Sequence, residues 1–195
     1  MNKTKFHITL NAPVTLIFAA ACFIVTLLGI FSGGRITQAA FMTWRASFRH
    51  PMTWLRLFTH VLGHDGMAHF VGNASYILLL GPMLEEKYGS GKLAAVIALT
   101  AVVTALVNML LFPHTALCGA SGIVFAFILL TSFTGFKDGE IPLTFILVAV
   151  IFLGQQIVEG ITLRDNVANF THIVGGLVGA GCGFVLNRAG KQEIS

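Results

Sequence analysis

Charged residues are scarce in this sequence. Asp, Glu, Lys and Arg together make up 10% of its 195 residues, whereas a water-soluble domain carries about 25%. This scarcity excludes an ordinary soluble globular domain. The basic residues are scattered along the chain and form no continuous stripe, so we expect no nucleic acid among the partners.

Cysteine is also rare. The chain has three cysteines, Cys22, Cys118 and Cys182, and their spacing is not that of a metal site. Each lies in or beside an apolar segment, where a cysteine usually acts as a small packing residue. We assign no function to them, and they do not indicate a redox compartment.

Hydrophobic residues are abundant instead, at 55% of the chain, and they occur in long runs. Three runs, Asn11 to Phe31, Leu93 to Cys118 and Ile141 to Val158, contain no charged residue. Because about 20 helical residues cross the hydrocarbon of a bilayer, such runs predict membrane-spanning helices. We expect one all-α membrane domain over residues 1–195. Its six spans fall at roughly 12–31, 66–84, 93–112, 119–134, 141–158 and 167–187.

The first span begins like a secretory signal peptide, with Lys3 and Lys5 before an apolar run. The apolar core of a signal peptide usually has about 7–15 residues. Because this run is longer, we expect it to be retained as a membrane span. Six spans place both termini on one side of the membrane, and all six lysines fall on that side. Since positive charge favours the cytoplasm, we predict cytoplasmic termini.

The segment 32–65, between the first two spans, mixes aromatic residues with arginine. It contains Trp44, Arg45, Trp54 and Arg56. Such residues suit a membrane–water interface, where amphipathic rings and long basic side chains settle. We expect short helices here that lie partly in the membrane.

A serine flanked by small residues opens the fourth span, in the sequence Gly119-Ala120-Ser121-Gly122. At the first turn of a helix the backbone amide has no intrahelical partner, and glycine lets another backbone approach. This arrangement suits a nucleophile whose oxyanion is held by backbone N–H groups. The alternative is a serine that caps a membrane helix, with glycines for packing.

A histidine lies early in the last span. His172 is followed by Gly175, Gly179 and Gly183, which form one smooth stripe at every fourth residue. His172 is three residues before Gly175 and shares its helix face. The imidazole is therefore carried to a close helix contact at membrane depth, where ionisable groups are usually functional. A histidine that only packs is the alternative.

Three more histidines and an asparagine lie around the start of the second span. His69 and Asn73 are four residues apart on one helix face, so their donors suit a developing oxyanion. His60, His64 and His69 also raise the alternative of a zinc site. The sequence has no HExxH motif, however, and Asp65 follows His64 directly. We therefore expect no metal, and Asp65 is assigned no role.

Together these three elements resemble the rhomboid family of intramembrane serine proteases, in its bacterial six-span type. The family has a GxSG serine on the fourth span, a histidine on the sixth and an HxxxN pair on the second. The matching residues here are Gly119 to Gly122, His172, and His69 to Asn73, in the same order. The resemblance implies a rhomboid-like helix bundle with a partly embedded loop, L1, between the first two spans.

Two positions depart from the family pattern. The family often has Trp-Arg before the second span, whereas Leu55 precedes Arg56 here and Trp54 stands one place earlier. Many bacterial members have a tyrosine one turn after the serine, stacked on the histidine, and Phe125 takes that place. The first change concerns loop anchoring, and the second keeps the ring.

The resemblance implies an endopeptidase with a catalytic dyad, in which Ser121 is the nucleophile and His172 the base. The Ser121 amide, His69 and Asn73 would bind the oxyanion. A supporting set would complete the site and its substrate pocket; it consists of Gly119, Gly122, Phe125, His60, His64 and Asn169. No cofactor is implied.

The implied substrates are membrane-spanning proteins, cut near the outer interface of the bilayer that also surrounds the enzyme. The implied location is the inner, cytoplasmic membrane of a bacterium. The segment 159–166 is our candidate gate, because Glu159, Arg164 and Asp165 keep it at the water interface.

Two other functions compete with the protease. An inactive rhomboid relative would bind membrane clients without cutting them, although such proteins generally lack the serine or the histidine. A transporter could relay protons through intramembrane histidines, but the two halves of the chain show no repeat. An aspartyl intramembrane protease would need carboxylates in two facing spans, and the predicted spans have none.

Overall fold

The computed structural model of the chain describes residues 9–135, 140–162 and 166–192. Regular structure in these ranges is helical, apart from isolated bridge residues, among them the antiparallel pair Thr43 and Leu117. The α-helices of the described residues are α1 (Pro13–Phe31), α2 (Arg35–Ala40), α3 (Pro51–Thr59), α4 (Met67–Tyr88), α5 (Ser90–Leu111), α6 (Ser121–Ser132), α7 (Leu143–Thr162) and α8 (Asn166–Gln192). Two 3₁₀ turns, η1 (His60–Leu62) and η2 (Phe133–Gly135), follow α3 and α6.

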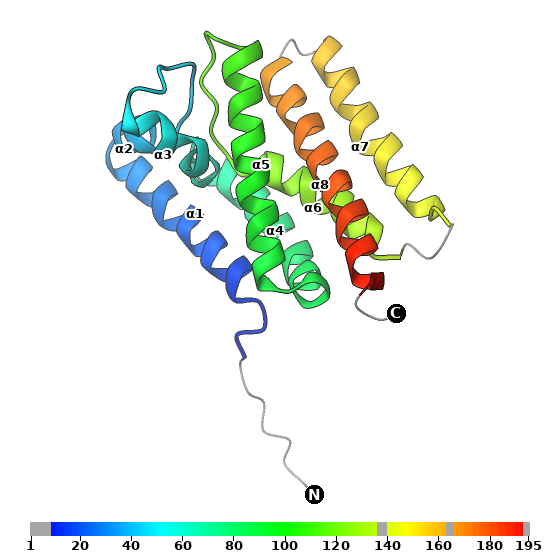
Figure 1. Ribbon diagram of the computed structural model, residues 1–195. Coiled ribbons are helices and arrows are strands. Elements are labelled where there is room, and N and C mark those ends of the chain that lie inside the picture. Colours follow the sequence, from blue (N-terminus) through cyan, green and yellow to red (C-terminus); the bar gives the residue numbers. More distant parts are fainter. Residues whose placement is uncertain (1–8, 136–139, 163–165, 193–195) are drawn as a thin grey trace, which may run out of the picture.

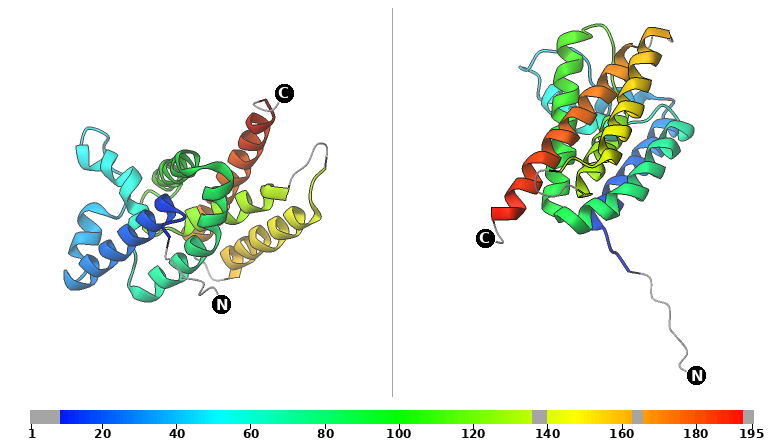
Figure 2. Two further views of the ribbon diagram at one scale, coloured as in Figure 1. Left: turned by 90° about the horizontal axis from the view of Figure 1, so that it is seen from below. Right: turned by 90° about the vertical axis from the view of Figure 1, so that its right-hand side faces the viewer.

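Each of the six predicted spans overlaps one α-helix, and α6 is the shortest of these six helices. Among the described residues, four helices are long and apolar enough to cross a membrane, namely α1, α4, α5 and most of α8. Helix α6 and the apolar part of α7, Leu143–Phe152, are shorter. The start of α1 and the end of α8 lie at the same end of the bundle (Figure 1). Both further views show the short α6 among the longer helices (Figure 2).

Helix α6 is the centre of the bundle. It packs most extensively against α8 and also contacts α4, α5 and α7. Between Ser121 and Thr131 its side chains are apolar on every face, and Ile123, Phe127 and Leu130 are fully buried. A helix that is hydrophobic all round belongs inside a protein, because no face of it suits water. The residue that begins α6 is therefore held at a fixed place inside the bundle.

The segment 32–65 contains α2, α3 and η1, and an arginine of α3 joins α3 to the end of α2 and the loop that follows. Arg56 donates from Nε and Nη2 to the carbonyl oxygen of Ala39, at 3.2 and 2.7 Å. Its guanidinium lies 3.9 Å from the ring centroid of Trp44. The aromatic partner of Arg56 is thus Trp44, while Trp54 donates to the carbonyl of Phe48 at 2.9 Å. Anchoring by Arg56 survives the departure from the Trp-Arg pattern.

A buried carboxylate joins α1, α4 and α5 at the opposite end. Glu85, in the last turn of α4, is 4% exposed. Its oxygens accept hydrogen bonds from the amides of Val14 and Thr15 at 2.9 Å and from the hydroxyls of Thr15 and Ser90 at 2.8 and 2.7 Å. The carboxylate therefore satisfies the first-turn amides of α1, which have no partner within their own helix. Sequence analysis did not identify this role.

We expect Glu85→Gln to lower the free energy of unfolding by about 1–3 kcal/mol, because it replaces charged acceptors and points an amide at two N–H donors. Glu86→Gln is the matched control, since Glu86 is exposed and next in sequence. Thermal unfolding of the purified proteins in detergent measures the difference. Equal loss of stability in both variants would contradict the assigned role.

Candidate active site

Ser121 is the first residue of α6, and the loop before it is held by the η1 region. The amide of Gly119 donates to the carbonyl of His60 at 3.0 Å. The amide of Ala120 lies 3.5 Å from Nε2 of His64. Gly119 has φ +121°, a conformation that side chains other than glycine rarely adopt. In the part of the chain that the structure describes, no side chain caps α6, as is usual where first-turn amides are left for another acceptor.

Helices α6 and α8 touch backbone to backbone. A Cβ added at Gly175 would lie 2.9 Å from Cα of Gly122, and one added at Gly179 would lie 2.6 Å from Cα of Ala126. Both contacts are shorter than real Cβ atoms tolerate. The paired residues advance together along both helices, so α6 and α8 run in the same direction. The predicted glycine stripe is therefore the α6–α8 contact surface.

This register brings His172 to within one helical turn of the level of Ser121. His172 precedes Gly175 by one turn, while Ser121 directly precedes Gly122. The imidazole stacks on the ring of Phe125, with centroids 4.4 Å apart and planes 6° from parallel. Both Ser121 and His172 are half-buried. The ring of Phe125 thus orients the imidazole by stacking, as expected for the aromatic residue one turn after the serine.

His69 and Asn73 meet the same loop from α4. A Cβ at Gly119 would lie 3.0 Å from Nε2 of His69 and 3.9 Å from Nδ2 of Asn73. Nδ1 of His69 is 3.4 Å from the amide of Asp65, which places the ring proton on Nε2, toward Gly119. The buried Nδ2 of Asn73 has no hydrogen-bond partner. Two N–H donors are thereby available beside the residues that lead into Ser121.

His60 and His64 are buried, at 1% and 3% exposure. Nδ1 of His60 donates to the carbonyl of Arg56, and Nδ1 of His64 donates to that of Leu62, each at 3.1 Å. Burial lowers the pKa of both imidazoles to about 4, so both are neutral at pH 7. Neutral His64 keeps the Nε2 lone pair that faces the Ala120 amide. Within the described residues, no group of three His, Cys, Asp or Glu side chains is placed to hold a metal.

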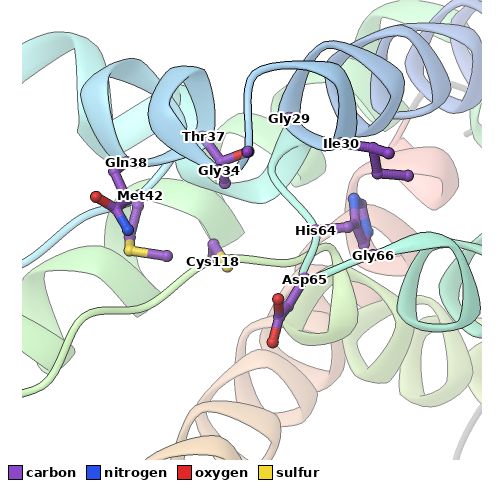
Figure 3. Close-up of a pocket in the computed structure, with 11 residues that line it drawn as sticks. Gly29, Ile30, Gly34, Thr37, Gln38, Met42, His64, Asp65, Gly66 and Cys118 are labelled. Atoms are coloured by element: carbon purple, nitrogen blue, oxygen red, sulfur yellow. The ribbon is translucent and has the colours of Figure 1, made fainter.

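A pocket of about 280 Å³ opens beside the serine loop (Figure 3). His64 lines it, as do Asp65, Gly66 and Cys118 on one side and residues of α1 and α2 on the other. Of the three residues expected to line a polar pocket, His64 lines this one. Neither His60 nor Asn169 is part of its lining, and Asn169 is buried near the start of α8.

Comparison with known sequences decides the family. Residues 51–189 match the Rhomboid domain, which is well over half of the chain. The chain belongs to the rhomboid family. This match confirms the resemblance drawn from the serine, histidine and HxxxN motifs. With its apolar helices, this rhomboid chain is an integral membrane protein.

Several curated relatives carry the name rhomboid protease GlpG. Those of Salmonella typhi, Salmonella newport and Salmonella typhimurium are each 29% identical to this rhomboid chain over 179 residues. The aligned region covers 89% of this chain and 63% of each relative. The chain therefore spans less than two thirds of the length of these relatives.

The structure describes only part of the candidate gate. Of the segment 159–166, residues 163–165 lie outside the described residues, and with them Arg164 and Asp165. Glu159 belongs to α7, with bounds Leu143–Thr162. The gate stays a prediction.

The α6–α8 contact makes a direct prediction about two glycines of one helix. Gly179→Val should lower the free energy of unfolding by about 1–3 kcal/mol or more, because its side chain must push α6 away. Gly181→Val is the matched control, since a Cβ at Gly181 meets nothing within 4 Å. Thermal unfolding in detergent compares the two. If Gly181→Val is as destabilised as Gly179→Val, the glycine stripe is not required for the close contact between α6 and α8.

Proposed function

We propose that this rhomboid chain is an intramembrane serine endopeptidase. The observation that carries the proposal is the stacking of His172 on Phe125, one turn from Ser121, across a backbone-to-backbone helix contact. Ser121 Oγ attacks the carbonyl carbon of a substrate amide while His172 takes its proton. The imidazolium then donates this proton to the leaving amine, and water hydrolyses the resulting ester by the same steps in reverse order.

The negative charge that develops on the carbonyl oxygen needs donors. The Ser121 amide at the start of α6, Nε2–H of His69 and Nδ2 of Asn73 supply them in our proposal. Support comes from the tautomer of His69 and from the buried, unpartnered Nδ2 of Asn73. An unsatisfied buried donor is costly in the resting protein, which is reasonable where a developing charge will accept from it.

We further propose one domain with six spans, in which α6 and α7 join the four longer helices. The loop 32–65 would lie partly in the membrane, and both termini would be cytoplasmic. The location is then the inner membrane of a bacterium. Substrates would be membrane-spanning proteins, cut near the outer interface, where a helix with glycine or proline unwinds most readily.

Cleavage of a single-span substrate by the purified, detergent-solubilised protein tests the dyad. Ser121→Ala and His172→Ala should each reduce kcat by at least about 10³-fold, since the two groups act as a unit. Ser75→Ala and His114→Ala are matched controls, because both side chains are exposed on other parts of the chain.

The opposite results have defined meanings. Cleavage that survives Ser121→Ala contradicts the serine mechanism, and cleavage that stops with a chelator points to a metal. A protein that neither cuts nor reacts at Ser121 with a fluorophosphonate, yet binds membrane clients, is the non-catalytic relative.

Asn73→Ala should separate catalysis from stability. We expect kcat to fall by about 10²–10³, as for loss of an oxyanion donor, with little loss of stability because Nδ2 has no partner to lose. Asn187→Ala is the contrasting control, since its Nδ2 donates to the carbonyl of Phe133 at 2.9 Å. It should lower stability and leave kcat unchanged. An Asn73→Ala protein with normal kcat would remove Asn73 from the oxyanion site.

A further inference from the structure

The pocket of about 280 Å³ lies beside the serine loop, close to where a substrate of the proposed protease would bind. Its wall includes Cys118, three residues before Ser121, and His64, whose Nε2 faces the Ala120 amide. Three residues of chain span at most about 11 Å. An extended substrate advances about 3.3 Å per residue, so a side chain in this pocket belongs to a residue within about four of the scissile bond.

The lining of the pocket is mainly apolar, with a few polar side chains set into it. Thr37 and Gln38 of α2 lie on one side, and Asp65 lies on the other with Cys118 and His64. Figure 3 shows Asp65 at the edge of the opening, across from Thr37 and Gly34. Three glycines of the lining, Gly33, Gly34 and Gly66, leave room for a long side chain, because a Cβ added at any of them would meet nothing within 4 Å.

Asp65 gives this pocket a negative charge that no other lining residue balances. The lining contains no lysine or arginine. His64 is neutral, because burial lowers its pKa to about 4. Burial, and then the nearby Asp65 carboxylate, raise the pKa of the Cys118 thiol to about 11, so the thiol is uncharged at neutral pH. No positively charged group in the pocket lining therefore offsets the charge of the exposed Asp65.

We propose that this pocket binds a basic side chain of the substrate, lysine or arginine, and that Asp65 is the residue that selects it. A long aliphatic stem fits the groove between α1 and the serine loop, while the charged end pairs with Asp65 at its edge. The inference rests on the proposed protease function and names a feature of its substrates. Asp65 itself takes no part in the chemical step.

The size of the preference follows from where Asp65 lies. An ion pair at an exposed position gains little, and partial enclosure raises that gain. We therefore expect kcat/KM for a lysine-bearing substrate to exceed that of its leucine counterpart by about threefold to tenfold, and a glutamate to be disfavoured to a similar extent.

The test scans a single-span model substrate. Lysine, leucine or glutamate replaces each of the four residues on either side of the scissile bond, and kcat/KM is measured with the purified full chain. The readout is the ratio of lysine to leucine at each position, because Asp65 also precedes the N-terminus of α4 and its replacement can alter stability. A ratio between substrates is insensitive to such a common loss.

One position should show the lysine preference in the wild type. Asp65→Asn should bring the ratio at that position to about one, and Asp65→Lys should reverse it in favour of glutamate. Glu86→Gln, which removes an exposed negative charge at the other end of α4, should leave the ratio unchanged. If Asp65→Asn keeps the lysine preference, or no position shows one, the inference is wrong although the protease stands. If nothing is cut and Ser121 resists a fluorophosphonate, the proposed function fails and the inference with it.

Discussion

The site depends on how closely the backbones of α6 and α8 approach. No side chain separates Gly175 from Gly122, or Gly179 from Ala126. This contact fixes the two helices in parallel register and sets the heights of Ser121 and His172. Lipid offers no hydrophobic drive for helices to associate, so close packing of small residues has to supply it. The stripe of glycines is therefore a requirement of the site as much as of the fold.

Around this contact, neighbouring groups position the loop and the imidazole of the proposed serine site. The loop before Ser121 is fixed by the His60 carbonyl and by neutral His64, and the imidazole of His172 is fixed by the Phe125 ring. The dyad assigns no role to a carboxylate. In the proposed dyad, stacking on Phe125 contributes to orienting the imidazole of His172. A site built on helices in this way can be precise without a long catalytic loop.

Much of the fold and of the candidate site follows from the sequence, because spans, glycine stripes and i, i+4 pairs are local patterns. The motifs placed Ser121, His172, His69 and Asn73 on elements that the structure brings together. The role of Glu85 was missed, because its partners on α1 lie about seventy residues away and no local pattern indicates them. The pairing of Arg56 with Trp44, and the wall that Asp65 shares with Cys118, were missed for the same reason. Long-range contacts of this kind are set by packing, which one sequence does not display.

Reaction of the purified protein with a fluorophosphonate, followed by mass-spectrometric mapping of the adduct, tests the central claim most directly. It needs no knowledge of the substrate, and it reports whether the α6–α8 contact activates the serine. Our account predicts an adduct on Ser121 that is lost in His172→Ala, with Ser75 and Ser132 unlabelled. A folded wild-type protein that carries no adduct on Ser121, or one whose adduct is unchanged in His172→Ala, would contradict it.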